Sequence, residues 1–150
     1  MARNPWLVIG GFLSLAAALL HVAVIAGGPD WYRFFGAGEG MARMAEQGSP
    51  VPALVTLGIA ALLAIWAAYA FAGAGLMRRL PLMRTALVAI TAIYLLRGLL
   101  IIPVLMKPDA AAFDIWSSLI VLVYGIVYAL GTWRAWQQLS QRKVSHALGS

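Results

Sequence analysis

Two ionisable side chains, His21 and Arg97, lie well inside stretches of the sequence that are otherwise mostly apolar. A guanidinium can bind an anion or pair with a carboxylate, and an imidazole can relay protons or bind a ligand near neutral pH. Ionisable groups in such stretches are costly and mark either a functional site or a structural contact. The sequence leaves two roles open for Arg97, an anion or ligand site and a structural lock. For His21 it leaves open a ligand or proton-relay role and a neutral hydrogen bond between helices.

Several classes of catalytic and cofactor site lack the residues that they need. The chain has no cysteine, so disulfides, thiolate metal sites and redox thiols are excluded. A bis-histidine haem site would need a second histidine in an apolar stretch, and His146 lies near the C-terminus. Ser117, His21 and Asp114 can be drawn as a nucleophilic triad, but no nucleophile-elbow motif accompanies them. We therefore expect no metal ion, no cofactor and no conventional hydrolase site.

Four long apolar stretches must position these side chains, and they cover residues 6–27, 52–77, 82–106 and 113–133. Of all residues 63% are hydrophobic and 11% are charged, whereas soluble domains have roughly 45–50% and about 25%. Each stretch can cross the roughly 30 Å core of a bilayer as a helix that rises about 1.5 Å per residue. The sequence predicts one all-α domain over residues 1–150, a four-helix transmembrane bundle.

The distribution of charge predicts how this bundle lies in the membrane. With both termini in the cytoplasm, all five acidic residues face outward, and seven basic residues lie inside against three outside. The inner ones are Arg3, Arg78, Arg79, Arg84, Arg134, Arg142 and Lys143, and the outer ones are Arg33, Arg43 and Lys107. This is the positive-inside bias, which accounts for the net charge of +6 without a nucleic-acid partner. We expect a multi-pass protein of the cell inner (plasma) membrane, surrounded by lipid, with residues 134–150 as a cytoplasmic tail.

The long connection over residues 28–51 predicts a short amphipathic helix on the outer membrane surface. Its apolar residues recur at helical spacing, and residues of opposite charge stand three or four positions apart. These are Phe34, Met41, Met44 and Ala45, and the pairs Glu39–Arg43 and Arg43–Glu46. Trp31 and Tyr32 suit the aromatic belt of a membrane interface. Two roles remain open, a passive interfacial anchor and a lid over a cavity.

The depths of the two ionisable residues below the outer ends of their helices predict a common site in the outer half of the bundle. Arg97 stands nine residues before Met106 and His21 six before Gly27, which places them about 14 Å and about 9 Å deep. Side chains lean toward the N-terminus of their helix, so Arg97 should face the interior, past Tyr94. Pro103 should kink the third helix above it. Any carboxylate partner must come from the outer side, from among Asp30, Glu39, Glu46 and Asp114.

Packing within the bundle is predicted from small residues and short turns. Small side chains at helical spacing allow close approach, within one chain or in a homo-oligomer. They are Gly10, Ser14 and Ala18, then Ala60, Ala64, Ala68 and Ala72, then Ser117, Gly125 and Ala129. Short connections favour antiparallel pairing of the second stretch with the third, and of the third with the fourth.

These patterns lead to one functional hypothesis and two alternatives. We expect the protein to bind or transport a small ligand, anionic or lipid-like, through a cavity open to the outer side. The candidate ligand-binding residues are His21, Arg97, Tyr94, Glu39, Asp30, Trp31, Tyr32, Asp114 and Ser117. The first alternative is an accessory or structural subunit in which Arg97 locks the bundle. The second is a membrane enzyme that acts on a lipid.

Overall fold

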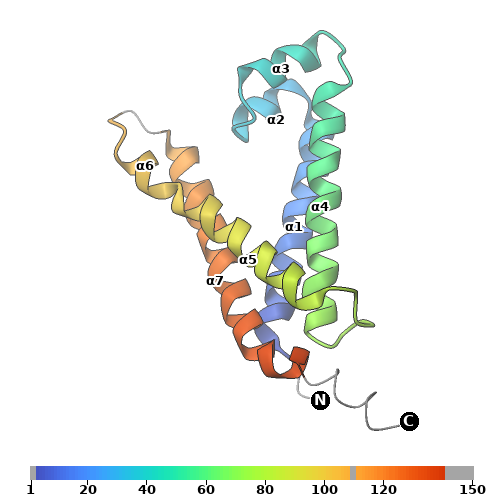
Figure 1. Ribbon diagram of the computed structural model, residues 1–150. Helices are drawn as coiled ribbons and strands as arrows, with labels where there is room; N and C mark the ends of the chain where they lie inside the picture. Colours follow the sequence, from blue (N-terminus) through green and yellow to red (C-terminus); the bar gives the residue numbers. More distant parts are fainter. Residues whose placement is uncertain (1–2, 109–110, 141–150) are drawn as a thin grey trace, which may run out of the picture.

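The computed structural model describes residues 3–108 and 111–140, and every regular element in that part is a helix (Figure 1). Asp109, His146 and the rest of the tail from residue 141 lie outside the described residues. The helices are α1 (Pro5–Gly27), α2 (Pro29–Phe34), α3 (Glu39–Glu46), α4 (Val51–Gly73), α5 (Met83–Leu99), α6 (Ile101–Leu105) and α7 (Ala112–Ser140). Four spans in this part are long and apolar enough to cross a membrane: α1, α4, Met83–Leu105 and Ala112–Gln137. The predicted class, an all-α four-helix membrane bundle, is confirmed.

The four spans form two antiparallel pairs that diverge like the arms of a V (Figure 1). The first arm consists of α1 and α4, and the second of α5, α6 and α7. The arms meet at a narrow end, where α1 begins and α7 ends, and separate toward a wide end that carries α2, α3 and α6. Pairing of the third and fourth predicted stretches is confirmed by α5 and α7. The prediction for the second and third is wrong, because α4 packs mainly on α1 and touches α5 little.

Glycines allow the pairing of α5 with α7, because they let two backbones approach closely. A Cβ atom added at Gly98 of α5 would lie 2.5 Å from the Cα atom of Leu122 in α7. One added at Gly125 of α7 would lie 2.9 Å from the backbone nitrogen of Leu95. In the second arm, α5 and α7 therefore pack with their backbones in contact, which a side chain larger than that of glycine would prevent at these two positions.

The buried faces of the helices agree in part with the predicted small-residue faces. Gly10, Ser14 and Ala18 of α1 are all buried, as predicted. On α4 the strict four-residue spacing fails, because Ala64 is exposed. The buried face consists instead of Pro52, Thr56, Ala60, Leu63, Ala67, Ala70 and Ala72. A helix has about 3.6 residues per turn, so a spacing of four drifts around it while alternating threes and fours do not.

A buried polar contact joins both arms where they meet. The Ser14 hydroxyl of α1 lies 2.9 Å from the Tyr94 hydroxyl of α5 and 2.7 Å from the Tyr128 hydroxyl of α7. The Tyr128 hydroxyl donates its proton to the Trp66 carbonyl of α4 at 3.3 Å. Tyr128 must therefore accept from Ser14, and Ser14 from Tyr94, so that each hydroxyl donates once. We call Ser14, Trp66, Tyr94 and Tyr128 the hub.

Helix breaks differ from the predicted boundaries for identifiable reasons. The third stretch divides at Leu100 into α5 and α6, because Pro103 cannot donate the backbone hydrogen bond that would continue the helix. The predicted kink at Pro103 thus takes the form of a break. The single helix predicted over the long connection is wrong: α2 and α3 are separate, and Gly36 and Gly38 between them have φ angles of 72° and 91°. Such left-handed backbone favours glycine and turns the chain back on itself.

A candidate ligand cavity beneath the cap

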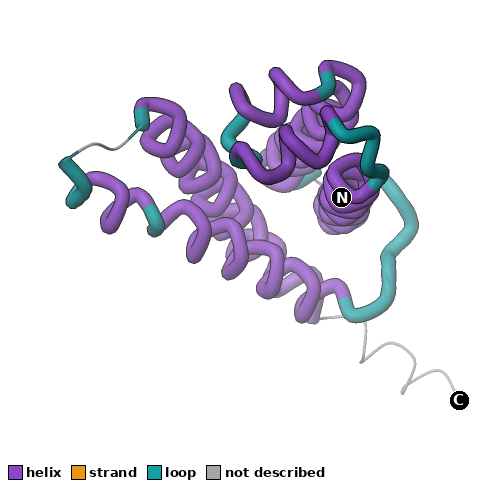
Figure 2. The backbone as a smooth tube through the Cα atoms, turned by 90° about the horizontal axis from the view of Figure 1, so that it is seen from above, coloured by secondary structure: helices purple, strands orange, loops and turns teal. Residues whose placement is uncertain are grey.

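The hairpin of α2 and α3, which we call the cap, lies across the wide end of the first arm (Figure 2). Its apolar side packs on α1, where Val24, Tyr32 and Ala42 form a buried cluster. Phe35, Met41 and Ala45 pack against that cluster. The cap is therefore seated by apolar contacts, and its polar side chains are left for the opposite side.

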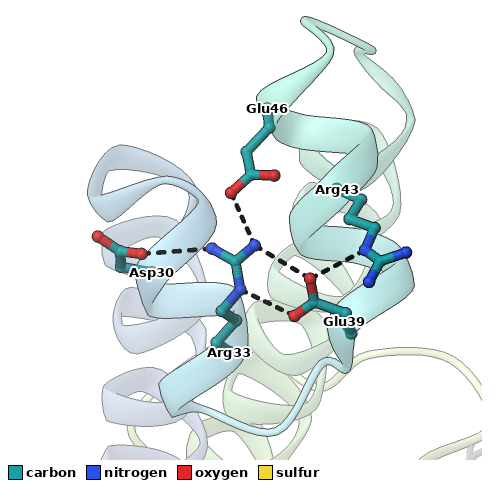
Figure 3. Close-up of polar contacts among 5 residues, drawn as sticks. All are labelled: Asp30, Arg33, Glu39, Arg43 and Glu46. Carbon is teal, nitrogen blue, oxygen red and sulfur yellow. Dashed lines mark hydrogen bonds and ion pairs between the residues drawn. The ribbon is translucent and has the colours of Figure 1, made fainter.

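An ion-pair network on the exposed side ties the two cap helices together (Figure 3). Arg33 of α2 lies 3.3 Å from Asp30, 2.8 Å from Glu39 and 2.7 Å from Glu46, and Arg43 lies 3.0 Å from Glu39. Hydrogen bonds from Arg33 and then Arg43 lower the pKa of Glu39 to about 2. The hydrogen bonds that Arg33 donates to Glu39 and then to Glu46 raise the pKa of Arg33. The predicted pair Glu39–Arg43 is confirmed, whereas Glu46 turns to Arg33 rather than to Arg43.

A cavity of about 360 Å³ lies under the cap, which places it at the small end of ligand pockets, about 300–1,000 Å³. The cap covers it, α1 and α4 form its sides, and the first turn of α7 contributes a single aromatic ring. The lining residues are Leu20, His21, Val24, Tyr32, Phe35, Gly36, Ala37, Met41, Val55, Thr56, Ile59 and Phe113. None of them is Asp, Glu, Lys or Arg, so we call this space the cap cavity and describe it as uncharged.

Three side chains give the cap cavity its polar groups. The Nδ1 atom of His21 lies 2.8 Å from the Ala17 carbonyl oxygen. A carbonyl oxygen can only accept a hydrogen bond, so Nδ1 carries the proton of this bond. In a neutral ring the other nitrogen, Nε2, is then a hydrogen-bond acceptor. Tyr32 is 2% exposed, and its buried hydroxyl has no hydrogen-bond partner among the described residues. Thr56 on α4 is also buried. A buried hydroxyl without a partner costs about 1–3 kcal/mol, so a polar ligand atom that reached the Tyr32 hydroxyl would be stabilising.

Phe113 of α7 closes the cap cavity from the second arm. Its ring lies edge-on to Phe35, with ring centroids 6.4 Å apart. It also packs directly on Gly36, where an added Cβ atom would lie 2.4 Å from the ring. The cap thus touches both arms, and Gly36 both turns the cap hairpin and admits the Phe113 ring.

Arg97 lies outside the cap cavity, whereas His21 lines it. The structure therefore does not bring the two residues together in the predicted common site. The two residues lie at similar depths along their helices but stand on different arms of the V. The depth of a residue along one helix does not determine which other helix packs beside it. Arg97 is exposed rather than interior, and its Nη1 atom donates to the Ser118 hydroxyl of α7 at 3.3 Å. No carboxylate of the described residues forms an ion pair with it.

The structure distributes the remaining predicted ligand residues over separate places. Tyr94 belongs to the hub, and Trp31 packs on Phe35 with ring centroids 5.6 Å apart and does not line the cap cavity. The Ser117 hydroxyl donates to the backbone carbonyl of Asp114 at 3.2 Å, so these residues form no triad with His21. Asp30 and Glu39 bind Arg33. His21 and Tyr32 are therefore the predicted residues that line the cap cavity.

Three features of the cavity are not apparent from residue types alone. Thr56 resembles any packing threonine of an apolar helix until α4 is placed beside α1. Phe113 stands at the start of a distant span, and Ala17 contributes only its carbonyl. The closely spaced Gly36 and Gly38 are the one signal that could have identified the turn of the cap.

Comparison of the chain with protein-family models, curated proteins and solved structures gives no match.

Proposed function

We propose that the protein binds a small uncharged amphiphile in the cap cavity. The observation that carries the proposal is the buried Tyr32 hydroxyl, which has no partner among the described residues. The Tyr32 side chain lines the cap cavity together with His21. A ligand hydroxyl can accept a hydrogen bond from Tyr32 and donate one to the Nε2 atom of His21. The hydrocarbon part of the ligand would contact the apolar walls, which include Phe35, Ile59 and Phe113.

The chemistry of the lining favours an uncharged ligand over an anionic one. No basic side chain lines the cap cavity, and Arg33 is bound by three carboxylates on the other side of the cap. A carboxylate or phosphate in the cavity would lose its hydration without gaining a counter-charge, which is strongly unfavourable. Of the two kinds of ligand expected from the sequence, we therefore propose the lipid-like one for this cavity and not the anionic one.

The proposed direction of access follows from the distribution of charge along the chain. Arg78 and Arg79 stand in the connection between α4 and α5 at the narrow end, and the carboxylates Asp30, Glu39 and Glu46 stand on the cap at the wide end. The positive-inside bias therefore favours a cytoplasmic narrow end and an outward-facing cap. In this orientation the ligand enters from the outer leaflet or the outer aqueous phase, and the cap is a lid rather than a passive anchor.

Three probes with equal chain length test the proposed chemistry. The melting temperature of the purified protein in neutral detergent is measured with increasing 1-decanol, decane or decanoate. The proposal predicts the largest stabilisation by decanol, because ligand binding to the folded state raises its stability by mass action. Equal effects of decanol and decane would contradict it, since the polar groups of the cavity would then be irrelevant.

A pair of tyrosine variants separates the cavity from general effects on the micelle. Tyr32→Phe should remove the preference for decanol over decane and should leave the ligand-free protein as stable as the wild type or more so. Tyr69→Phe loses a hydroxyl that donates to the Pro81 carbonyl at the narrow end, and should retain the preference for decanol. If neither decanol nor decane stabilises the wild type, the accessory-subunit alternative is favoured instead.

A further inference from the structure

Arg97 carries a positive charge within a predicted membrane span and lacks a counter-charge among the described residues. The described carboxylates are Asp30, Glu39 and Glu46, which bind Arg33, and Asp114, which forms no ion pair. The hydrogen bond that the structure gives Arg97 is to the neutral Ser118 hydroxyl. A guanidinium has five N–H donors, so most of its capacity for binding an anion is unused.

The position of Arg97 places this charge where the two arms separate. Tyr94, three residues earlier on nearly the same face of α5, contacts Ser14 and Trp66 of the first arm. The arms diverge toward the wide end (Figure 1). Arg97 stands about one turn beyond Tyr94 in that direction and is exposed. It stands eight residues before the end of the span Met83–Leu105, which corresponds to about 12 Å along the helix.

We propose that Arg97 binds the phosphate group of a membrane phospholipid whose acyl chains lie between the diverging arms. A guanidinium matches two phosphate oxygens with parallel N–H donors, which makes the contact strong and directional. Ser118, which is 1% exposed, positions the guanidinium through its hydroxyl oxygen. Apolar helices that separate inside a bilayer must have hydrocarbon between them, and a phospholipid supplies both the hydrocarbon and the counter-charge.

This site is distinct from the cap cavity in its residues and in the charge of its ligand. Arg97 and Ser118 do not line the cap cavity. A phosphate at the level of Arg97 lies below the usual headgroup plane, and local thinning of the bilayer around an arginine within a membrane span accommodates such a position. Asp114 stands one helical turn from Ser118 on α7, so its negative charge opposes the phosphate.

The test compares three additives with the purified protein in neutral detergent: phosphatidylglycerol, a diacylglycerol with the same acyl chains, and inorganic phosphate at matched ionic strength. The melting temperature is followed as each is titrated. We expect phosphatidylglycerol to stabilise the wild type at a concentration at least about tenfold lower than diacylglycerol, as a charge-assisted hydrogen bond predicts. Arg97→Gln should remove this difference, and Arg97→Lys, which keeps the charge but not the fork of donors, should reduce it.

Two further variants separate the site from general charge effects. Lys107→Gln removes one exposed positive charge near the wide end and should leave the preference for phosphatidylglycerol intact. Asp114→Asn should strengthen that preference. Equal losses in Lys107→Gln and Arg97→Gln would overturn the site. Stabilisation by inorganic phosphate alone, dependent on Arg97, would overturn the lipid source and indicate a free oxyanion. A dimer that Arg97→Gln and Asp114→Asn both dissociate would overturn the proposal in favour of a carboxylate from a second copy.

Discussion

The Ser14 hydroxyl of α1 lies 2.7 Å from the Tyr128 hydroxyl of α7, and this contact joins the two arms where they begin to diverge. Because Tyr128 donates to the Trp66 carbonyl, its oxygen accepts from Ser14, and a single chain of donors crosses all four spans. On the wide side of this contact the arms carry different chemistry. The first arm holds the uncharged cap cavity with His21, and the second holds Arg97.

Ser14→Ala tests the hub. The variant leaves the Tyr94 hydroxyl without its acceptor and the Tyr128 hydroxyl without its donor. Hydrogen bonds between membrane helices contribute about 1–2 kcal/mol at most, so we expect a loss of that order and a lower melting temperature in detergent. Ser117→Ala removes a hydroxyl that bonds only within its own helix and should cost less. Equal effects of the two variants would show that the hub does not join the arms.

Gly98→Ala tests the close contact within the second arm. The added methyl group would lie 2.5 Å from the Leu122 Cα atom, and a backbone atom can move only if α5 and α7 separate. Overpacking of this kind costs about 1–3 kcal/mol. Gly58→Ala on α4 is the matched control, because nothing lies within 4 Å of its added Cβ atom. We expect a reduced melting temperature for Gly98→Ala and an unchanged or slightly raised one for Gly58→Ala; similar values for both would refute this packing.

The cap should lose its ordered position in acid. The folded state lowers the pKa of Glu39 from 4.5 to about 2, so its ionised form stabilises the cap. This contribution is complete above the ordinary value and is lost as the pH falls through about 2. Spin labels at Gly40 of α3 and Gly58 of α4 should give a narrow distance distribution down to about pH 4.5 and a broader one near pH 2.

Glu39→Gln serves as the control for the acid experiment. It removes the carboxylate that bonds both Arg33 and Arg43, so the broad distribution should already be present at neutral pH. A wild-type distribution that is unchanged at the lowest pH would mean that the apolar contacts under the cap hold it without the ion-pair network.

Topology reporters test the proposed orientation. A fusion within residues 78–81 should report the cytoplasm, and one near Gly40 should report the outer side. The reason is the positive-inside bias of the connecting segments, to which Arg78 and Arg79 contribute most directly. A cytoplasmic signal near Gly40 would reverse the orientation and place the cap cavity on the inner side.

The spans and the polar positions could be predicted from the sequence because lipid requires continuous apolar helices and makes exceptions such as His21 and Arg97 conspicuous. The separation of these two residues could not, since distance along a helix gives height but not the neighbouring helix. Pairing depends instead on where backbones approach closely, as at Gly98 and Gly125. The cap shows the same limit: a helical pattern runs through residues 31–47, but the left-handed backbone at Gly36 breaks it.

The central claim, that a hydroxyl-bearing amphiphile binds between Tyr32 and His21, is tested most directly by ¹⁵N NMR of the His21 ring. The chain has two histidines, so His146→Gln leaves a single imidazole to observe. In mildly alkaline buffer the ligand-free ring should carry its proton on Nδ1, which bonds the Ala17 carbonyl, and show an unprotonated Nε2. We predict that 1-decanol shifts the Nε2 resonance as a hydrogen-bond acceptor and that decane does not. An Nε2 resonance that stays in place at saturating decanol, or a ring protonated on Nε2 instead, would contradict the claim.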